Sequence, residues 1–402
     1  MRLSMVFGAA LLTSCLISEA QAQIGPFKTI HIGVSGPFSG GSAPIGLSMR
    51  NGIRLAIDEI NQVGGIGGQQ FELIEFNDEA KEELGAKIAD ELIRQRVTAT
   101  IGVVNTGVGM VTIDAYQKAG VPLLVAVSTG PELTKRYAPP AASINYIFRV
   151  SPTADLEVRA LVAELKRNKT SSVSWLVADS AYGNAGTKVF KHEIGTAGIK
   201  LSSEDRFQVG DKDMRAQVVR AMASGSQAVV VWGSGPELGV IAKHREAFKW
   251  KVPMLTSWTS SSRNFIETSG KAGEGIMMPQ TFIQDMGSTS KNGFLLSYGR
   301  MFKTDVLASP MGAAQGYDGM HLLYRAIRQA NSGDGSKIRA ALENLDTRYQ
   351  GVITSYSHPF SSNDHDAITL NMLWIGRIVN GRVEYAYRED QRRDALLRFK
   401  AH

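Results

Sequence analysis

Short β-branched runs alternate with amphipathic stretches along the first two thirds of the chain. Residues 29–35 (TIHIGVS) predict a strand, and residues 49–62 predict a helix with Met49, Ile53 and Ile57 recurring on one face. Further strands are predicted at 71–77, 99–104 and 121–127, with helices at 81–96 and 108–118. Strands that alternate with helices indicate βαβ units, and therefore a parallel sheet covered on both faces.

The same alternation starts again after residue 150. Helices are predicted at 153–167, 183–197, 214–223 and 238–250, and strands at 173–178, 200–207, 228–232 and 252–256. Two successive blocks of this kind predict two similar α/β lobes instead of one long sheet. No linker rich in glycine and serine separates the blocks, so we expect short crossing segments that act as a hinge.

The last third of the chain follows a different pattern. Helices are predicted at 292–302, 313–330 and 336–345, and two strands at 372–379 and 382–387 flank the hairpin signal Asn380-Gly381. This order predicts that the chain returns to the first lobe and then crosses again. The predicted division is a signal peptide at 1–22, the N-terminal lobe at 28–149, the C-terminal lobe at 150–280, a return to the N-terminal lobe at 281–350, and the last part of the C-terminal lobe with the tail at 351–402.

Composition narrows the classes of protein to which the chain can belong. It has 402 residues, 43% of them apolar and 20% charged, which is ordinary globular usage and excludes a disordered chain. The formal net charge is +6, and residues 377–402 carry half of it, with seven Lys or Arg against four Asp or Glu. Because no basic run with interleaved aromatic residues occurs elsewhere, nucleic acid is not expected as a partner.

The N-terminus predicts a secretory signal peptide. An apolar stretch at 3–12 is followed by small residues at 20–22 (AQA), which match a signal peptidase site. The alternatives are a buried N-terminal helix and lipid attachment at Cys15, because residues 12–15 (LTSC) resemble a bacterial lipobox. We favour cleavage after residue 22, since the apolar residues directly after Cys15 would be an unusual start for a lipoprotein. The mature chain then contains no cysteine and no disulfide.

A search for catalytic and metal motifs finds none. The sequence contains no G-x-S-x-G, H-E-x-x-H or G-x-x-x-x-G-K-[ST]. His358 and His365 share a polar loop with two aspartates, but a metal site needs several ligands at fixed geometry, so a solvated loop is the favoured interpretation. The sequence therefore predicts a protein that is not an enzyme and that has no metal or organic cofactor.

Polar residues follow three of the predicted strands, at the sheet edge where open α/β sheets bind ligands. These loops are Asn105-Thr106-Gly107, Ser128-Thr129-Gly130 and the segment from Asp179 to Gly183, which contains Tyr182. The first two place hydroxyl groups and free backbone amides at helix starts, which suits a ligand carboxylate. The alternative for either loop alone is simple N-capping, and Tyr182 is either a rim aromatic or a core residue.

The opening of the mature chain resembles a known family. Residues 33–40 (GVSGPFSG), Gly46 and residues 52–61 (GIRLAIDEIN) are similar to the opening of the branched-chain amino acid (Leu/Ile/Val) binding proteins. These are periplasmic components of ABC importers, and the resemblance extends from about residue 30 to residue 379. It implies a type I periplasmic binding fold: two Rossmann-like lobes, three crossing hinge segments and a ligand cleft between the lobes. It also implies a periplasmic monomer that delivers its ligand to membrane permease subunits.

The resemblance also implies site residues. Thr106 and Gly107 match the first carboxylate-binding loop, Ser128 and Thr129 the second, and Tyr182 the aromatic residue after a C-terminal-lobe strand. Tyr317 matches an aromatic wall, and Ser234 or Gly235 stands where leucine-type binders carry a tyrosine. The family's amino acid binders place a glutamate after the strand equivalent to 253–256 to pair the ligand ammonium, and here Trp258 stands there.

The missing glutamate changes the expected ligand. A buried ammonium without a carboxylate is costly, so we expect a small carboxylate without an amine, such as an aromatic acid. The first alternative is an amino acid or amide, with Asp318, Asp179 or Glu237 pairing the ammonium and Trp258 packed in the core. The second is a ligand sensor of the same fold, and an α/β hydrolase or dehydrogenase is disfavoured by the missing motifs.

Overall fold

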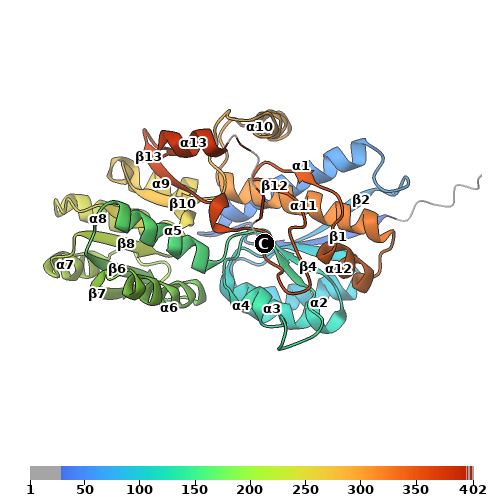
Figure 1. The fold of residues 1–402 in the computed structure, drawn as a ribbon, viewed down its shortest axis with the longest axis horizontal. Helices are drawn as coiled ribbons and strands as arrows, with labels where there is room; N and C mark the ends of the chain where they lie inside the picture. The colour runs from blue at the N-terminus through green and yellow to red at the C-terminus, as the bar shows by residue number, and fades with distance from the viewer. Residues whose placement is uncertain (1–28, 395, 397–398, 401–402) are drawn as a thin grey trace, which may run out of the picture.

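The computed structural model describes residues 29–394, 396 and 399–400, so the predicted signal peptide and Cys15 lie outside the described residues. Two α/β lobes lie side by side, the N-terminal lobe on the right of Figure 1 and most of the C-terminal lobe on the left. Within the described ranges, none of the helices combines the length and apolar content that a membrane span requires. The predicted fold class, two α/β lobes with parallel sheets, is confirmed.

The N-terminal lobe is built on a parallel sheet of order β2-β1-β3-β4-β5. Its strands are β1 (Ile30–Gly36), β2 (Phe71–Asn77), β3 (Ala99–Gly102), β4 (Leu123–Val125) and β5 (Ile147–Arg149). Its helices are α1 (Ala43–Gln62), α2 (Glu82–Arg94), α3 (Thr106–Ala119), α4 (Glu132–Lys135), α11 (Pro310–Ala330) and α12 (Gly335–Glu343). The central strands β3 and β4 are buried throughout, as expected for a sheet covered on both faces.

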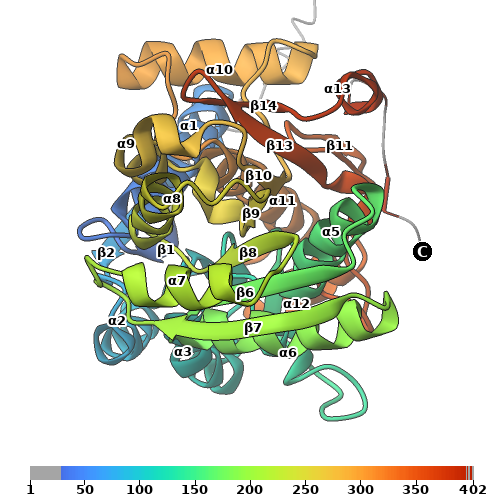
Figure 2. The same cartoon turned by 90° about the vertical axis from the view of Figure 1, so that its left-hand side faces the viewer.

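The C-terminal lobe contains a mixed sheet of order β14-β13-β10-β9-β8-β6-β7, which faces the viewer in Figure 2. Its strands are β6 (Ser172–Ala178), β7 (Lys200–Phe207), β8 (Ala228–Trp232), β9 (Met254–Thr256), β10 (Met277–Gln280), β13 (Trp374–Val379) and β14 (Arg382–Tyr385). Its helices are α5 (Ala154–Arg167), α6 (Ala181–Thr196), α7 (Arg215–Ala223), α8 (Glu237–Ala247) and α9 (Arg263–Ser269), with the short 3₁₀ turns η1 (Trp258–Ser261) and η2 (Gly270–Gly273). The predicted terminal hairpin is confirmed, since β13 and β14 pair antiparallel around Asn380 and Gly381, both with positive φ.

Two helices of the N-terminal lobe cross with their backbones in contact. A Cβ built on Gly52 of α1 would lie 2.0 Å from the carbonyl oxygen of Ala313 in α11. A Cβ built on Gly316 of α11 would lie 2.2 Å from the carbonyl oxygen of Met49 in α1. Only glycine fits at both positions, which explains one of the glycines in the opening motif.

The chain passes between the lobes near residues 150–153 and again after β10, before α10 (Thr289–Phe302), which runs across the top of the molecule in Figure 2. The third crossing comes later than the predicted boundary at 351. The Arg149 amide donates to the His365 carbonyl oxygen, and the Ala367 amide donates to the Arg149 carbonyl oxygen, both at 2.9 Å. Residues 365–367 therefore extend the N-terminal sheet beside β5, and the crossing occupies the turn η3 (Leu370–Met372) and its neighbours.

The lobes also touch directly beside the cleft. Asn264 Nδ2 of α9 donates a hydrogen bond of 2.6 Å to the carbonyl oxygen of Gly41, in the loop before α1. This contact joins two segments that are far apart in sequence, one from each lobe.

Candidate functional site

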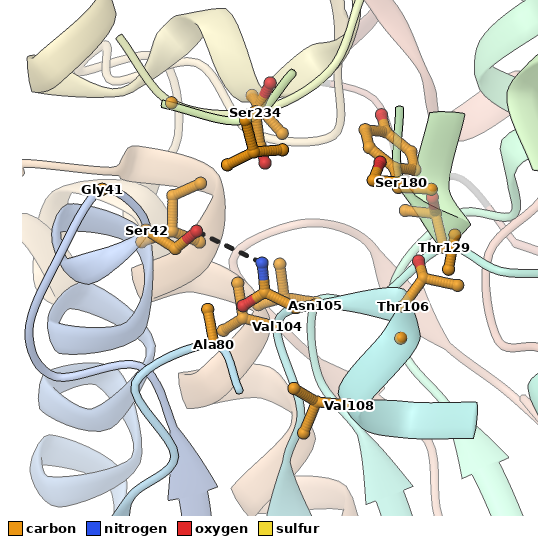
Figure 3. A pocket seen from close by; sticks show the side chains of 18 of the residues that line it. Gly41, Ser42, Ala80, Val104, Asn105, Thr106, Val108, Thr129, Ser180 and Ser234 are labelled. Carbon is orange, nitrogen blue, oxygen red and sulfur yellow. Dashed lines mark hydrogen bonds between the residues drawn. The ribbon is translucent and has the colours of Figure 1, made fainter. Parts of the chain in front are cut away.

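A cleft of about 450 Å³ lies between the lobes, where strands of both sheets end. The N-terminal lobe contributes the loop before α1, the start of α2, the start of α3 and the segment after β4 (Figure 3). The C-terminal lobe contributes the loops that precede α6 and α8 and the turn η1. Of the predicted site residues, those that line this cleft are Thr106, Gly107, Thr129, Tyr182, Ser234 and Trp258.

The start of α3 supplies polar groups to the floor of the cleft. The first amides of a helix have no partner within the helix, so those at Thr106 and Gly107 are available to an anion. A Cβ on Gly107 would lie 2.1 Å from a carboxylate oxygen of the exposed Glu82 side chain, which would have to move aside. Asn105 donates to the Ser42 hydroxyl at 3.2 Å, and its Oδ1 atom has no partner.

The two hydroxyl residues after β4, Ser128 and Thr129, differ in position relative to the cleft. Thr129 lines the cleft, and its buried Oγ1 atom has no hydrogen-bond partner. Ser128 does not line the cleft, and its hydroxyl lies 3.1 Å from Thr106 Oγ1. Ser128 therefore supports Thr106 from behind, and the structure does not place its side chain in the cleft as predicted.

Aromatic side chains form the opposite wall. Tyr182 follows Ser180, whose hydroxyl accepts from the Gly183 amide at 3.0 Å and so fixes the start of α6. The Tyr182 ring packs at 4.9 Å from the Trp232 ring, and burial raises the pKa of its phenol well above the usual value. Trp258 begins η1 directly after β9 and is 2% exposed although it lines the cleft.

Sequence reasoning missed Glu157 of α5, a fully buried carboxyl group behind this wall. Glu157 Oε2 accepts from the Tyr182 hydroxyl at 3.0 Å and from the Trp258 amide at 3.2 Å. Burial raises the pKa of Glu157 to about 8, against the lowering effect of these two donors and the Thr129 hydroxyl. The signal was present in the sequence, because Glu157 interrupts the apolar face that continues through Val158 and Leu161.

Two predicted site residues lie away from the cleft. The Tyr317 hydroxyl donates to Glu59 at 2.6 Å, and its ring packs against Phe294, so it forms no wall of the cleft. Asp318 is fully buried within the N-terminal lobe and does not line the cleft either. It accepts four hydrogen bonds of 2.9–3.2 Å, from the amides of Val352 and Ile353 and from the hydroxyls of Tyr349 and Tyr356.

We expect Asp318→Asn to lower the free energy of unfolding by about 2 kcal/mol and to leave ligand affinity unchanged. Each Asp318 oxygen accepts from one backbone N–H and one tyrosine hydroxyl, so the NH₂ group of an asparagine would face such a pair and leave a buried backbone N–H without an acceptor. Urea unfolding measures the first effect and calorimetric titration the second. A loss of affinity that exceeds the loss of stability would return Asp318 to the binding site.

Charge on the cleft wall is acidic. Four carboxylate residues line it, and the described lining contains no Lys or Arg. Asp179 pairs with Arg206 at 3.1 Å, whereas Glu237 has one oxygen that accepts from the Gly210 amide and another, buried, without a partner. The four are Glu79, Glu82, Asp179 and Glu237. In the part of the chain that the structure describes, no three His, Cys, Asp or Glu side chains gather as a metal site would need.

Two α/β lobes joined by three crossings, with a polar and aromatic cleft between them, define a protein of the two-lobed solute-binding class. Sequence comparison agrees: residues 29–382 match the model of a periplasmic binding protein family. The chain belongs to this family, among the type I members related to branched-chain amino acid binders, and the predicted resemblance is confirmed. It is a solute-binding component of an ABC-type transporter, and the family indicates a periplasmic location.

Individual relatives are distant. The leucine-, isoleucine-, valine-, threonine- and alanine-binding protein of Pseudomonas aeruginosa is 26% identical over 346 residues, 85% of this chain and 88% of that protein. A type 1 periplasmic binding protein from Bordetella pertussis matches with a TM-score of 0.81 and 23% identity, covering 89% and 100% of the two chains. A solute-binding protein from Rhodopseudomonas palustris, in complex with 3,4-dihydroxybenzoic acid, matches with a TM-score of 0.76 and 21% identity, covering 88% of this chain and 95% of that chain. The structural matches show the shared fold.

Proposed function

We propose that this protein captures a small carboxylate that has a flat or apolar body and no amine, such as an aromatic acid. The ligand carboxylate sits at the start of α3 and the Thr129 hydroxyl, and its body lies against Tyr182 and Trp258. Closure of the two lobes holds the ligand, because groups from both lobes contact it only in the closed form. The protein then acts as a monomer that delivers the ligand to the permease subunits, without chemical change.

The observation that carries this proposal is the polarity of the two walls. A buried threonine hydroxyl without a partner lies beside free helix amides on one wall, and this combination suits an anionic oxygen. On the other wall, a tryptophan occupies the position that the resemblance assigns to an ammonium-pairing glutamate. Of the four acidic side chains in the lining, Glu79 and Asp179 already pair with cations, Lys81 and Arg206 respectively. Glu237 forms no such pair among the described residues.

A second candidate is an amino acid ligand. The buried oxygen of Glu237 that lacks a partner favours it, since it offers an acceptor for an ammonium. The Pseudomonas aeruginosa relative, whose name describes amino acid binding, also supports this alternative. A role as a ligand sensor uses the same cleft, and the choice between transport and sensing follows from the partner that docks on the closed form.

Calorimetric titration with matched ligand pairs distinguishes the candidates. The pairs are leucine with 4-methylpentanoate and phenylalanine with 3-phenylpropanoate, each differing in the ammonium alone, and benzoate is added as an aromatic acid. The proposal expects heat and a rise in Tm only with the amine-free members. Binding of leucine or phenylalanine without a response to their partners would contradict the proposal and favour the amino acid alternative.

A further inference from the structure

Glu157 contacts both cleft-lining residues of the aromatic wall while remaining out of the cleft itself. Its Oε2 atom receives the Trp258 amide and the Tyr182 hydroxyl, and its Oε1 atom lies 3.3 Å from the same hydroxyl. The Thr129 hydroxyl of the other lobe is near enough to influence its ionisation. The Thr129 carbonyl oxygen accepts from the Ala154 amide at 2.8 Å, one turn before Glu157 on α5, so Thr129 lies beside this carboxyl group. Glu157 is therefore hydrogen-bonded to the aromatic wall and adjacent to the opposite wall.

Among the residues that the structure describes, no Lys, Arg or His forms an ion pair with this carboxyl group. Among the described residues, its ionisation responds to burial first, and then to the Trp258 amide, Tyr182 and Thr129, with no Lys, Arg or His among the causes. The other charged groups nearby lie on α5 itself, on α6 and β13, which pack against α5, and on the adjoining cleft wall. On α5 they are Asp155, Arg159, Glu164, Lys166 and Arg167, and on α6 Lys188, Lys191, His192 and Glu193. β13 contributes Arg377, and the cleft wall contributes Asp179 and Glu237. Since the pKa is raised to about 8, the neutral acid predominates at neutral pH.

The protonation state decides which way neighbouring hydroxyls point. Because Oε2 already accepts two donors, the acid proton belongs on Oε1, where it acts as a donor. A protonated Glu157 needs no hydrogen from Thr129, so the Thr129 hydroxyl is free to donate into the cleft. An ionised Glu157 instead attracts that hydroxyl hydrogen and places a negative charge behind the anion site.

We propose that Glu157 is a positioning residue that selects the charge of the ligand, by directing the Thr129 hydroxyl toward a ligand carboxylate when it is protonated and away from it when it is ionised. This inference rests on the proposed function above. Binding of a carboxylate is then linked to binding of a proton, because the complex keeps Glu157 protonated at a pH where the free protein has begun to release that proton.

The experiment is calorimetric titration of the full-length mature protein with benzoate, 3-phenylpropanoate and 4-methylpentanoate between pH 6 and pH 9.5. Wild-type affinity should be nearly constant up to pH 7 and fall about tenfold between pH 7 and pH 9. Near pH 8.5, titrations in buffers of different ionisation enthalpy should show proton uptake on binding. Glu157→Gln should bind with an affinity that does not change with pH. The control Glu164→Gln alters another buried glutamate about two turns further along α5 and should keep the wild-type profile.

Two results would overturn the inference while the proposed function stands. One is a wild-type affinity for a carboxylate that stays constant across the whole range, and the other is a Glu157→Gln profile that falls like the wild type. Failure of the proposed function shows separately, at pH 7 alone, as no binding of any amine-free carboxylate. Leucine binding that strengthens as pH rises from 7 to 9 would make Glu157 an ammonium acceptor and would also overturn the inference.

The ligand-free protein provides a second readout. A carboxyl group with a raised folded-state pKa contributes stability that is full below its ordinary pKa of 4.5 and is lost as pH rises through about 8. The Tm of the wild type should therefore fall relative to that of Glu157→Gln between pH 5 and pH 8. A constant difference would show that Glu157 does not titrate in this range and would contradict the inference.

Discussion

Replacing Thr129 by valine should weaken binding of a carboxylate ligand by roughly tenfold to a hundredfold, with little change in stability. A hydrogen bond to a charged group contributes about 1.5–3 kcal/mol, and 1.4 kcal/mol corresponds to a factor of ten in Kd. Thr129 Oγ1 makes no hydrogen bond to the described residues, although it lies beside Glu157, so its removal should cost little stability. Calorimetric titration and urea unfolding of the same preparation measure the two quantities.

Ser128→Ala is the matched control, since it removes a neighbouring hydroxyl that does not line the cleft. Loss of its contact with Thr106 should lower stability by about 1 kcal/mol and reduce affinity only a few fold. If Thr129→Val bound the ligand as the wild type does, the residue would have a structural role only. The carboxylate would then need another donor.

Replacing Gly52 by alanine should destabilise the N-terminal lobe by about 1–2 kcal/mol or more. The added methyl group would lie 2.0 Å from the Ala313 carbonyl oxygen, and neither backbone can move without separating α1 from α11. Overpacking of this kind typically costs about 1–3 kcal/mol and occasionally more, and it outweighs the gain in helix propensity of about 1 kcal/mol. A lower midpoint in urea unfolding, with reduced soluble yield, is the expected result.

Gly293→Ala is the control for helix propensity alone. Gly293 lies inside α10, where a Cβ would have no neighbour within 4 Å. This substitution should leave stability unchanged or raise it by up to about 1 kcal/mol. Equal stability of the Gly52→Ala and Gly293→Ala proteins would show that α1 and α11 do not depend on the close approach.

The sequence pattern predicted most of the fold because strands and helices in α/β lobes differ in period and length. The strand at 71–77 and the terminal hairpin were predicted with correct positions. The strands β5 and β10 were missed because each has only three or four residues and depends on pairing with neighbours for its conformation. The third crossing was placed too early because the pairing of residues 365–367 with β5 is a long-range contact.

The loops that line the cleft were predictable where a rule of topology applies. Thr106, Thr129 and Tyr182 follow strands, and strand ends meet at one edge of a parallel sheet. Tyr317 and Asp318 were misplaced because similarity to a family does not determine which way a side chain of α11 faces. Glu157 was missed because its role depends on Trp258, about a hundred residues away in sequence.

The hydrogen bond from Asn264 to the Gly41 carbonyl oxygen bears on the kinetics of uptake. A single neutral hydrogen bond contributes about 0.5–1.5 kcal/mol, which is too little to keep the cleft shut between encounters with ligand molecules. We therefore expect ligands to bind at similar rates and to differ mainly in their residence times. In the proposed transport role, a poorly matched solute should therefore enter as readily as the cognate one and leave sooner.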